Sequence, residues 1–519
     1  MPGKICLYAW TIRYLKPSQV FWRIGKRLGV HCRLKGSTPS RNAAGQLLPA
    51  FPEMDRDPGF LSRFSAEDLM EDRVTFLHET ETISWEGSWH AENRSALWNF
   101  NLHYFEFLHS LADRWLESGN EAYLAKTVQM IRGWIRSNPK DRGGPGWSSY
   151  TISLRLTNWL SYLSVTSHGL SEEFRRELED AMFEQYVHLS AHLEKDILGN
   201  HYFENLKALV LCGLYFGDPQ ARSIYLPAFY RECREEILPD GMHFERSPMY
   251  HKIILEGLIR VAVVLKEDTF LRQLVQDMLD AAYSMEAGLT CTPLFNDSGD
   301  NVAKRLESLL SAAQNHLGLT PRRKTALPSA GYYFFEEGPW RLIVDAGQPG
   351  PDYIPGHAHC DAMSFELYRD GNPFLVNCGT YAYQCRERSF FRSTRAHNTV
   401  QILGTEQSEV WSTFRLARRS RTKVLELREK EIRMEMTDHR GNRIQRDLQL
   451  NGDCLCICDR SKGKQLQSHL HSIGDVRINS VAPLNREKAL YAPEFGQLRT
   501  IEHIFATGSG SVELRVLLP

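Results

Sequence analysis

Short motifs along the chain concentrate side chains that can move protons. The first is GNHYFEN at residues 199–205, in which His201 and Glu204 stand three positions apart. Because residues three apart share one face of a helix, the carboxylate could hold the imidazole charged or fix which ring nitrogen carries the proton. The alternative is structural, with Asn200 at the start of a helix and a satisfied histidine behind it.

A second motif, PDGMHFERSPMYH at residues 239–251, passes from a turn into a helix. Tyr250 stands near the start of that helix, next to an apolar-periodic segment. A tyrosine beside a cationic group can have its pKa lowered toward neutral and take part in proton transfer. The competing interpretation is a tyrosine at the edge of a packed core.

A third motif, GHAHCD at residues 356–361, places two histidines two positions apart. In an extended segment His357 and His359 face opposite sides, so one can reach a cleft while the other holds a metal ion or packs behind it. His397, in RAHNTV, is a further candidate ligand, and two histidines with an oxygen ligand suit zinc or another divalent ion. No serine-hydrolase, nucleotide-binding or HExxH fingerprint occurs in a convincing context.

Composition predicts a soluble globular protein that must hold any anionic ligand locally. The chain has 519 residues, 42% hydrophobic and 24% charged, with a formal net charge of −1 and no apolar run of transmembrane length. A net charge close to zero argues against binding of nucleic acid by overall electrostatic attraction. The stretch RERSFFRSTR, with arginines from Arg386 to Arg395, could bind a polyanion, and a solvated loop is the equal alternative.

Cysteines and the N-terminus give further limits. The 11 cysteines are scattered without a CxxC pair, which argues against a disulfide framework or a zinc ribbon. No secretory signal is evident, and cellular location and oligomeric state are left open. Residues 18–28 predict a basic amphipathic helix, for which packing against the body of the protein is favoured over contact with a membrane.

Two kinds of structure must position these motifs. From about residue 95 to 320, apolar residues recur with helical spacing and no strand-like alternation intervenes. After about residue 328, short alternating runs are broken by Gly, Asn, Asp and Pro, which predicts an antiparallel sandwich. The apolar-periodic segments include residues 102–116, 123–135, 151–165, 174–193 and 253–265. The predicted fold is multidomain α+β, with a packed helical extension at 1–90, an all-α domain of helical hairpins at 91–325 and an antiparallel β-sandwich at 326–519.

Taken in order, LGNHYFEN, DGMHFERSPMYH, GHAHCDAMSFEL, FLVNCGTYAY and FRSTRAHNTV resemble the heparinase II/III and alginate lyase superfamily. The resemblance covers most of the chain from about Trp98. It implies an (α/α) toroid, an incomplete barrel of helical hairpins, followed by a β-sandwich, with a cleft where the two meet. It also implies a polysaccharide lyase that cleaves uronate-containing chains, such as hyaluronan, chondroitin, heparan sulfate or alginate, by β-elimination to 4,5-unsaturated oligosaccharides.

The resemblance assigns catalytic roles to four residues. Asn200 and His201 would bind and neutralise the uronate carboxylate, which offsets the charge of the enolate-like intermediate. Tyr250 would donate a proton to the leaving glycosidic oxygen, and would also act as base when proton and leaving group share a face of the sugar. His357 would be the base on the opposite face.

The same resemblance implies a metal site and a set of substrate contacts. His359 and His397 match metal ligands of zinc-containing members, and Asn377 stands where those members have an aspartate. An amide oxygen lacks the charge that helps an aspartate hold zinc, so manganese and calcium are alternatives. The residues expected to bind substrate are Trp98, Asn99, Asn101, His103, Tyr104, Trp147, Arg155, Trp159, Glu204, Glu245, Arg246 and Arg392.

Two other functions stay open at this point. A glycoside hydrolase on the same toroid would need two carboxylates flanking the bond, for which Asp240, Glu245 and Asp361 are candidates. A non-catalytic polysaccharide-binding protein, or an assembly factor for a bacterial capsule or exopolysaccharide, fits the departure at Asn377 and the missing signal peptide. The complete set of four catalytic residues argues against that second alternative.

Overall fold

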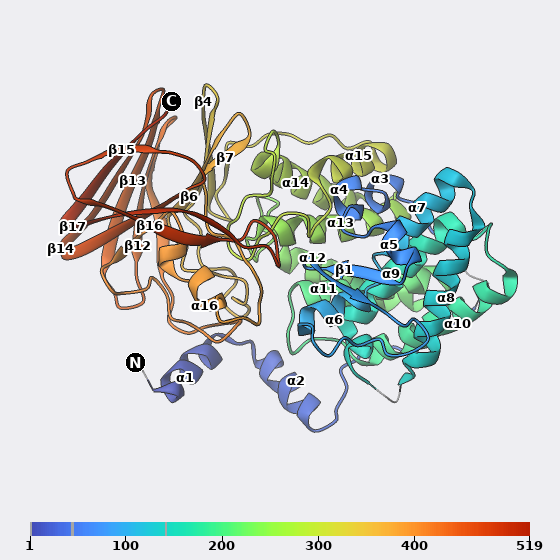
Figure 1. The fold of residues 1–519 in the computed structure, drawn as a ribbon. Coiled ribbons are helices and arrows are strands. Elements are labelled where there is room, and N and C mark those ends of the chain that lie inside the picture. Colours follow the sequence, from blue (N-terminus) through green and yellow to red (C-terminus); the bar gives the residue numbers. More distant parts are fainter. Residues whose placement is uncertain (1–2, 43–45, 141–142) are drawn as a thin grey trace.

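The computed structural model describes residues 3–42, 46–140 and 143–519, and its helical part forms a ring (Figure 1). Alternate helices along the chain contact one another and form an inner row. The helices between them in sequence pack against that row. The inner helices are α7 (Leu108–Ser118), α9 (Ser149–Thr166), α11 (Asn200–Tyr215), α13 (Pro248–Val264) and α15 (Leu306–Leu317). The intervening helices are α8 (Glu121–Ser137), α10 (Glu172–Ala191), α12 (Leu226–Glu236) and α14 (Thr269–Glu286). This arrangement is the predicted toroid of helical hairpins.

Short N-terminal elements close the ring between its first and last helices. The helix α3 (Pro52–Asp55) contacts α15, and α5 (Ala66–Met70) contacts α7. The same region contains α4 (Pro58–Leu61) and a hairpin of β1 (Arg73–Phe76) and β2 (Glu79–Thr82). The prediction of a helical extension missed this hairpin, whose turn residues Leu77 and His78 take φ values of 55° and 61°. Two further helices, α1 (Lys4–Tyr14) and α2 (Pro17–Arg27), precede these elements.

The apolar pattern over residues 102–116 predicts one helix, but the chain forms two. The helix α6 (Ala96–Leu102) ends before Phe105, which has a φ of 63°, and α7 begins at Leu108. A positive φ interrupts a right-handed helix. Phe105 is fully buried and packs on Trp89 and Trp159. The break is therefore set by aromatic packing, which helical periodicity does not encode.

The C-terminal part is one antiparallel network of thirteen strands. Four strands separate β4 from β13 in the order of the sheet, yet the two contact each other, so the sheet folds back into two layers around a shared apolar core. The strands are β3 (Ala326–Leu327), β4 (Tyr332–Glu337), β5 (Trp340–Asp345), β6 (Ser364–Arg369), β7 (Asn372–Leu375), β8 (Val400–Ile402), β11 (Arg421–Leu427), β12 (Glu431–Thr437), β13 (Arg443–Asn451), β14 (Cys454–Ser472), β15 (Arg477–Ser480), β16 (Leu484–Tyr491) and β17 (Arg499–Leu517). Beside it lie α16 (Arg388–Phe391) and a hairpin of β9 (Val410–Trp411) and β10 (Arg415–Leu416).

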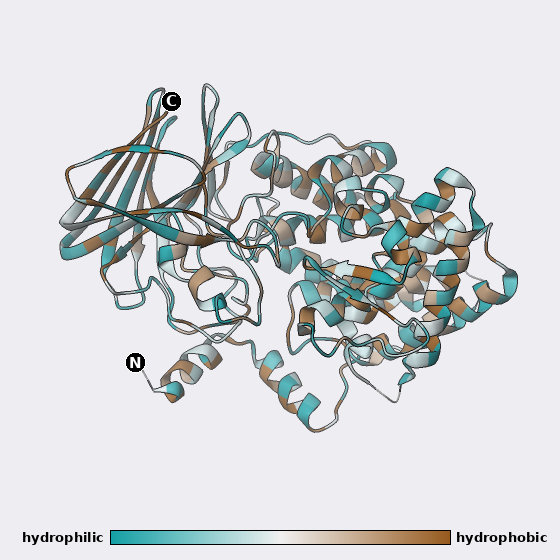
Figure 2. Cartoon of the chain, viewed as in Figure 1, coloured by the Kyte–Doolittle hydropathy of each residue, from teal (hydrophilic) through white to brown (hydrophobic). Residues whose placement is uncertain are grey.

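A common core joins the helical ring to the sheet. Met242 and Met285 from the ring pack with Tyr332 and Ile343 from the sheet, and all four are buried. Hydrophobic and hydrophilic residues alternate along both helices and strands (Figure 2), as expected where each element buries one face. Because the joint is apolar and buried, the residues that face each other across the two domains are held in fixed relative positions.

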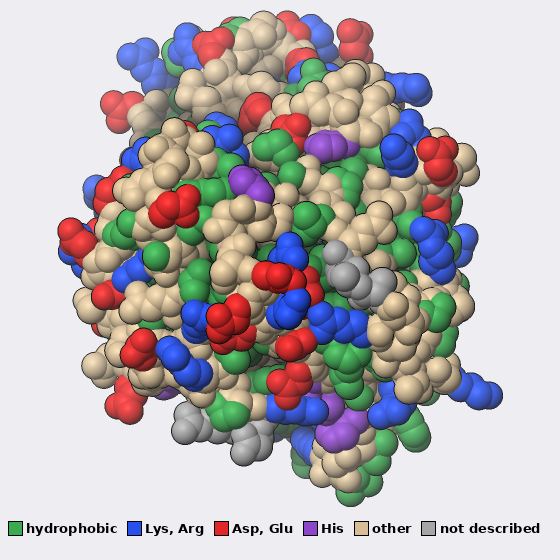
Figure 3. Space-filling model, turned by 90° about the vertical axis from the view of Figure 1, so that its right-hand side faces the viewer, with side chains coloured by type: hydrophobic (Ala, Val, Ile, Leu, Met, Phe, Trp, Pro, Cys, Tyr) green, Lys and Arg blue, Asp and Glu red, His purple; other side chains and the backbone are tan. Residues whose placement is uncertain are grey.

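The face of the helical ring that Figure 3 shows has no extended field of one sign. On the face of the helical ring seen in Figure 3, acidic and basic side chains are intermixed. Ion pairs such as Arg114–Glu67 and Arg132–Glu177, both at 2.7 Å, are typical of this domain. No helix within the described ranges is long and apolar enough to cross a membrane. On this face, no patch of one sign offers a site for an anionic ligand.

Candidate active site

A cavity of about 1420 Å³ lies where the helical ring meets the sheet. Asn200 and His201, at the start of α11, and Tyr250, in the first turn of α13, line it from the ring. His357, in the loop between β5 and β6, lines it from the sheet. The four residues predicted to be catalytic thus share one cleft, and their individual roles stay predictions.

A glycine brings Asn200 close to Glu245. Gly199 has φ 60° and ψ −150°, and a Cβ atom built there would lie 2.7 Å from Glu245 Oε1. Only glycine adopts this backbone without strain or collision. The Asn200 side-chain amide then donates to both carboxylate oxygens of Glu245, at 3.1 Å each. The start of α11 is thereby fixed against the turn that precedes α13.

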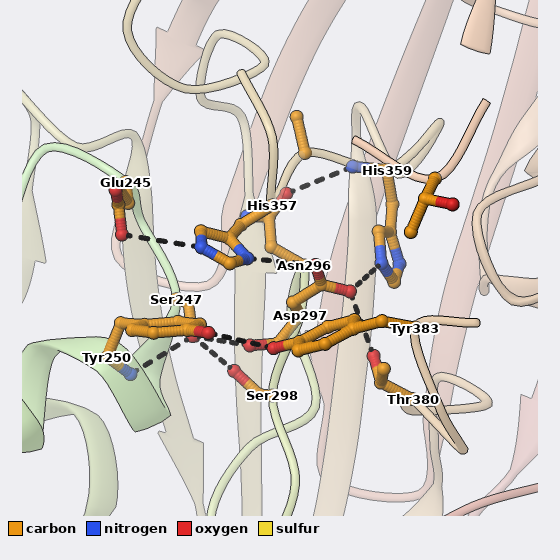
Figure 4. A network of polar contacts seen from close by, with 12 residues as sticks. Glu245, Ser247, Tyr250, Asn296, Asp297, Ser298, His357, His359, Thr380 and Tyr383 are labelled. Atoms are coloured by element: carbon orange, nitrogen blue, oxygen red, sulfur yellow. Dashed lines mark hydrogen bonds and ion pairs between the residues drawn. The ribbon is translucent and has the colours of Figure 1, made fainter. Parts of the chain in front are cut away.

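Ser247 connects the helix of Tyr250 to the sheet side of the cleft. Its Oγ accepts a hydrogen bond from the Tyr250 backbone N–H at 3.2 Å and so caps α13. The same hydroxyl donates to the backbone carbonyl of Asp297 at 2.8 Å and lies 2.9 Å from Ser298 Oγ (Figure 4). Tyr250 is therefore positioned by the loop that also positions His357.

Asp297 orients the imidazole of His357. The Asp297 Oδ2 atom lies 2.9 Å from His357 Nδ1, whereas His357 Nε2 is 3.9 Å from Glu245 Oε2, beyond hydrogen-bond distance (Figure 4). A proton on Nδ1 that donates to Asp297 leaves Nε2 as the basic nitrogen. The arrangement fits a general base.

Asp297 is itself fully buried and surrounded by donors. Arg388 forms a two-point ion pair with its carboxylate, one contact being 2.7 Å, and His359 Nε2 lies 2.8 Å from Oδ1. Thr380 donates to the same oxygen at 3.2 Å. Burial alone would raise the pKa of Asp297, but Arg388 and the two histidines hold it well below its ordinary value. The group is a permanent anion.

Tyr250 keeps its proton at neutral pH. Its ring lies 4.1 Å from the His357 ring, and its hydroxyl is 2.8 Å from that of Tyr383. Burial, and next the neighbouring Tyr383, raise the pKa of Tyr250 well above its ordinary value. The expectation that a nearby cation lowers this pKa is wrong for the free protein, because phenol and carboxylate groups surround the hydroxyl. A protonated phenol is the state that a proton donor needs.

The pKa of His201 is also raised, and its acidic partner differs from the one predicted. His201 Nδ1 lies 3.2 Å from Glu194 Oε1, while Glu204 forms an ion pair with Lys207 instead. Burial alone would lower the pKa of His201, but the carboxylates of Glu194 and Glu245 raise it. The imidazolium is favoured, which suits a group that binds a carboxylate.

Comparison with known families agrees with this geometry. The family model described as Heparinase II/III N-terminus matches residues 59–325, and the model described as Heparinase II/III-like, C-terminal, matches residues 319–490. The chain belongs to the heparinase II/III family. The resemblance drawn from the ordered motifs is thereby confirmed.

Relatives within the heparinase II/III family include heparin-sulfate lyases. The lyase of Pedobacter heparinus is 25% identical over 62% of this chain and 54% of its own length. That of Bacteroides thetaiotaomicron is 22% identical over 66% of this chain and 57% of its own length. The chain thus spans a little over half the length of these curated relatives.

Solved structures share the fold. Heparinase III aligns with a TM-score of 0.66 at 17% identity, covering 98% of this chain and 93% of that one. The chondroitin AC lyase of Streptomyces coelicolor aligns at 0.54 and 11% identity, over 96% of this chain and 82% of that one. The predicted fold class of a helical toroid followed by an antiparallel β-domain is confirmed.

The predicted metal ligands include two neighbouring imidazoles that have nitrogens without a hydrogen-bond partner. The rings of His359 and His397 are 5.2 Å apart, and His359 Nδ1 and both nitrogens of His397 are buried without a hydrogen-bond partner. Burial lowers the pKa of His359 to about 4 and that of His397 well below its ordinary value, so both rings are neutral. Asn377 Oδ1 accepts from the backbone N–H of Asn398, next to His397. Across the described ranges, no three His, Cys, Asp or Glu side chains are arranged to hold a metal ion, so a third ligand here would be an amide.

Most of the predicted substrate contacts are scaffold instead. Asn101, Tyr104 and Glu204 line the cavity, and Glu245 lies behind Asn200. Seven of the others are buried outside the cavity lining, and Arg246 lies outside the lining without being buried; the seven are Trp98, Asn99, His103, Trp147, Arg155, Trp159 and Arg392.

The side chains of Arg155 and Arg392 show why residue type alone is a poor guide to substrate contacts. Arg155 is fully buried, donates to the backbone carbonyl of Gly146 at 2.7 Å and stacks 3.9 Å from the Trp134 ring. Arg392 is also fully buried and donates to the backbone carbonyl of Ala358 at 2.8 Å. Residue type alone does not tell a ligand-binding arginine from one that satisfies backbone carbonyls.

The arginine-rich stretch is not one anion site either. Arg388 is committed to Asp297, and Arg395 pairs with Glu487 at 2.6 Å. Each guanidinium of the stretch thus has its own partner, since Arg386 also pairs with a neighbouring glutamate. This separate pairing gives no support to a polyanion site along the stretch, and that interpretation stays a prediction.

The sequence did not indicate that Asp297, Tyr383 and Glu194 belong to the site, because each lies in a loop without periodicity. The polar run FNDSGD around Asp297 was the one signal that could have drawn attention, since polar residues clustered just before the sheet are candidates for a site.

We expect Asp297→Ala to lower stability strongly, because it leaves the buried guanidinium of Arg388 unpaired. Breaking a buried ion pair on one side costs about 3–5 kcal/mol. The measurement is the midpoint of chemical denaturation. Arg386→Ala removes an exposed arginine from the same segment and should leave the midpoint unchanged. Equal midpoints for the two variants would contradict the role given to Asp297.

We expect NMR titration to give His201 a pKa above the ordinary value of histidine. Glu194→Gln should lower that pKa. A raised folded-state pKa means that the contact with Glu194 stabilises the fold below the unfolded pKa and is lost as pH rises through the folded value. Glu92→Gln, an exposed carboxylate outside the cavity, is the control and should change nothing. An unshifted His201 in the wild type would refute the ion pair.

Proposed function

We propose that this chain is a polysaccharide lyase that cleaves a uronate-containing glycosaminoglycan by β-elimination. The observation that carries the proposal is the convergence of His201, Tyr250 and His357 on one cavity, where His201 and Tyr250 are favoured in their protonated forms and Asp297 orients His357. Heparan sulfate is the first polymer to test, because relatives bear the name heparin-sulfate lyase.

Carboxylate binding is the first requirement of this chemistry. The proton next to a uronate carboxylate is weakly acidic, and its removal becomes accessible when fixed donors offset the charge that develops. In the proposal the cationic His201 and the amide of Asn200 supply those donors. Glu245 now accepts from that amide, so the substrate carboxylate must compete with Glu245 for it.

Proton removal and proton donation then complete the elimination. His357 Nε2 takes the C5 proton, the electron pair forms the C4–C5 double bond, and the C4–O bond breaks. Tyr250 gives its proton to the departing oxygen. On a sugar whose proton and leaving group share one face, Tyr250 would act as base and then as acid: its phenolate takes the C5 proton and passes that proton to the leaving oxygen, a route that requires Tyr250 to lose its own proton first.

Hydrolysis by two carboxylates is disfavoured by the pairing of the acids in the cavity wall. Glu204 pairs with Lys207, and Glu256 pairs with Arg260 at 2.7 Å. Of the acids suggested by sequence, Glu245 is held by Asn200 and lies 2% exposed. A glycosidase needs one acid that carries a proton and one free anion across the bond.

We also propose that His359, His397 and Asn377 hold a divalent ion, zinc or manganese, with calcium as the alternative. Unpaired buried imidazole nitrogens support this, as does the contact of His359 Nε2 with Asp297, because a carboxylate behind a ligating histidine is a frequent support of metal sites. The ion would supply rigidity to the loop that carries His357.

We expect the protein to release products with a 4,5-unsaturated uronate at the new non-reducing end. The measurement is ultraviolet absorbance during incubation with heparan sulfate, chondroitin, hyaluronan and alginate, followed by mass spectrometry. Tyr250→Phe should lower turnover by about 10²–10⁴-fold, the usual contribution of a general acid or base. Tyr381→Phe, the same change at another tyrosine of the cavity lining, should retain near-normal turnover.

Two results would overturn this proposal. Shortened chains whose new ends are all saturated would establish a hydrolase. Binding of one polymer, together with no cleavage of any polymer tested, would favour the non-catalytic alternative.

We expect zinc or manganese to raise the melting temperature of the metal-free protein. An ion at 100 times its Kd stabilises a fold by about 2.7 kcal/mol. Asn377→Asp should tighten zinc binding because it adds a negative ligand, and His397→Ala should abolish the effect. A melting temperature insensitive to every ion in both the wild type and Asn377→Asp would rule out the site.

A further inference from the structure

The helices α1 and α2, here called the N-terminal arm, bridge the two domains beside the cleft (Figure 1). On α1, Tyr8 packs edge-on against Trp411 of the sheet domain, with ring centroids 4.8 Å apart, and Trp411 Nε1 donates to Thr11 Oγ1 at 3.1 Å. On α2, the buried Gln19 donates to the backbone carbonyl of Ile197 at 3.1 Å. The Gln19 amide also donates to the backbone carbonyl of Tyr353, in the loop between β5 and β6, at 3.3 Å, so α1 is fixed to the sheet side of the cleft and α2 to both sides.

The arm contributes to the wall of the cavity and places an arginine there. Arg23 of α2 and Arg415 of β10 both line the cavity, as does Tyr8. Arg23 donates to the backbone carbonyl of Asp196 at 3.0 Å, and the Asp196 carboxylate is approached by Lys26 at 3.5 Å. The predicted basic amphipathic helix at residues 18–28 is thus α2, packed on the protein.

Arg415 has aromatic neighbours and no acidic one. Its guanidinium lies over the rings of Tyr8 and Trp411, 5.3 and 4.8 Å from their centroids. Its neighbours Arg418 and Arg419 pair with Glu409 and Asp352, at 2.6 and 2.8 Å. Within the part of the chain that the structure describes, neither Arg23 nor Arg415 forms an ion pair.

The two guanidinium groups act on each other through the cavity. Desolvation is the main reason that the pKa of Arg23 is lowered, the Asp196 carboxylate opposes it, and the charge of Arg415 lowers the pKa further. Two like charges that line a common space are relieved by an anion placed there.

We propose that Arg23 and Arg415, with the Tyr8 ring, form a second anionic subsite, which binds a sulfate or carboxylate group of the polysaccharide outside the reacting unit. This inference rests on the proposed function. It makes the N-terminal arm a specificity element, because the subsite exists only while α1 and α2 are packed along the cleft. Planar guanidinium groups suit both acidic groups, and an aromatic ring beside them suits a sugar face.

The test is equilibrium binding in the Tyr250→Phe background, where turnover does not interfere. The probes are fluorescently labelled heparan sulfate oligosaccharides and their unsulfated counterpart. Arg23→Gln with Arg415→Gln should weaken binding by about fivefold to tenfold, a size expected for two partly exposed charge contacts, and the loss should shrink at high salt. The corresponding lysine double variant should retain most of the affinity.

Arg13→Gln is the matched control, since Arg13 lies on α1 over the Trp10 ring and outside the cavity lining. Loss with sulfated probes alone identifies a sulfate subsite, and loss with both probes identifies a carboxylate subsite. Equal affinity of the glutamine double variant and Arg13→Gln would overturn the subsite, as would an absence of binding by the protein with both arginines. Weaker binding by the double variant, together with no unsaturated product from any polymer, would sink the proposed function and leave the subsite standing.

Discussion

The carboxylate of Asp297 is the interaction on which the rest of the cleft depends. It is fully buried, and it receives donors from the loop before β6, from the segment after β7 and from α16. An isolated carboxylate at such a depth would cost several kcal/mol, so the two-point pair with Arg388 is what permits a permanent charge there. That charge in turn fixes His357 toward the cavity and His359 toward the interior. One buried ion pair therefore links the cleft to the candidate metal ligands.

The cavity holds neighbouring protonated groups in different charge states by different physical means. Tyr250 stays protonated because burial disfavours a phenolate, while His201 tends to stay protonated because two carboxylates outweigh burial. This division between a neutral donor and a cation allows one site to bind a carboxylate and to protonate a leaving group. Ser247 joins the two halves, since it caps the helix of Tyr250 and donates to the backbone of Asp297. The domain joint of buried apolar residues keeps these distances fixed.

Local signals in the sequence predicted the helical hairpins and the sheet, and the resemblance of its ordered motifs to a known family implied the toroid and the four candidate catalytic residues. Hydrophobic spacing is a property of short segments, and motif order survives where identity is low. The same signals failed wherever a side chain's role depends on distant contacts. Trp98 and Arg155 are aromatic and basic as predicted, yet both point into the scaffold. The partner of His201 is Glu194, which precedes the helix, rather than Glu204, one turn along it. Asp297 gains its importance from Arg388, 91 positions later, which no local pattern encodes.

We propose that a uronate carboxylate binds at Asn200 and His201, while His357 removes the C5 proton of the sugar and Tyr250 protonates the leaving oxygen. A crystal structure of the Tyr250→Phe variant with a heparan sulfate oligosaccharide tests it most directly. The account predicts a carboxylate within about 3 Å of the Asn200 amide and the His201 ring, a usual hydrogen-bond distance. It also predicts that the C5–H bond faces His357 Nε2 or the site of the missing hydroxyl. An oligosaccharide seated in the cavity with no carboxylate at Asn200 and His201, or with C5 turned away from both groups, would contradict the account.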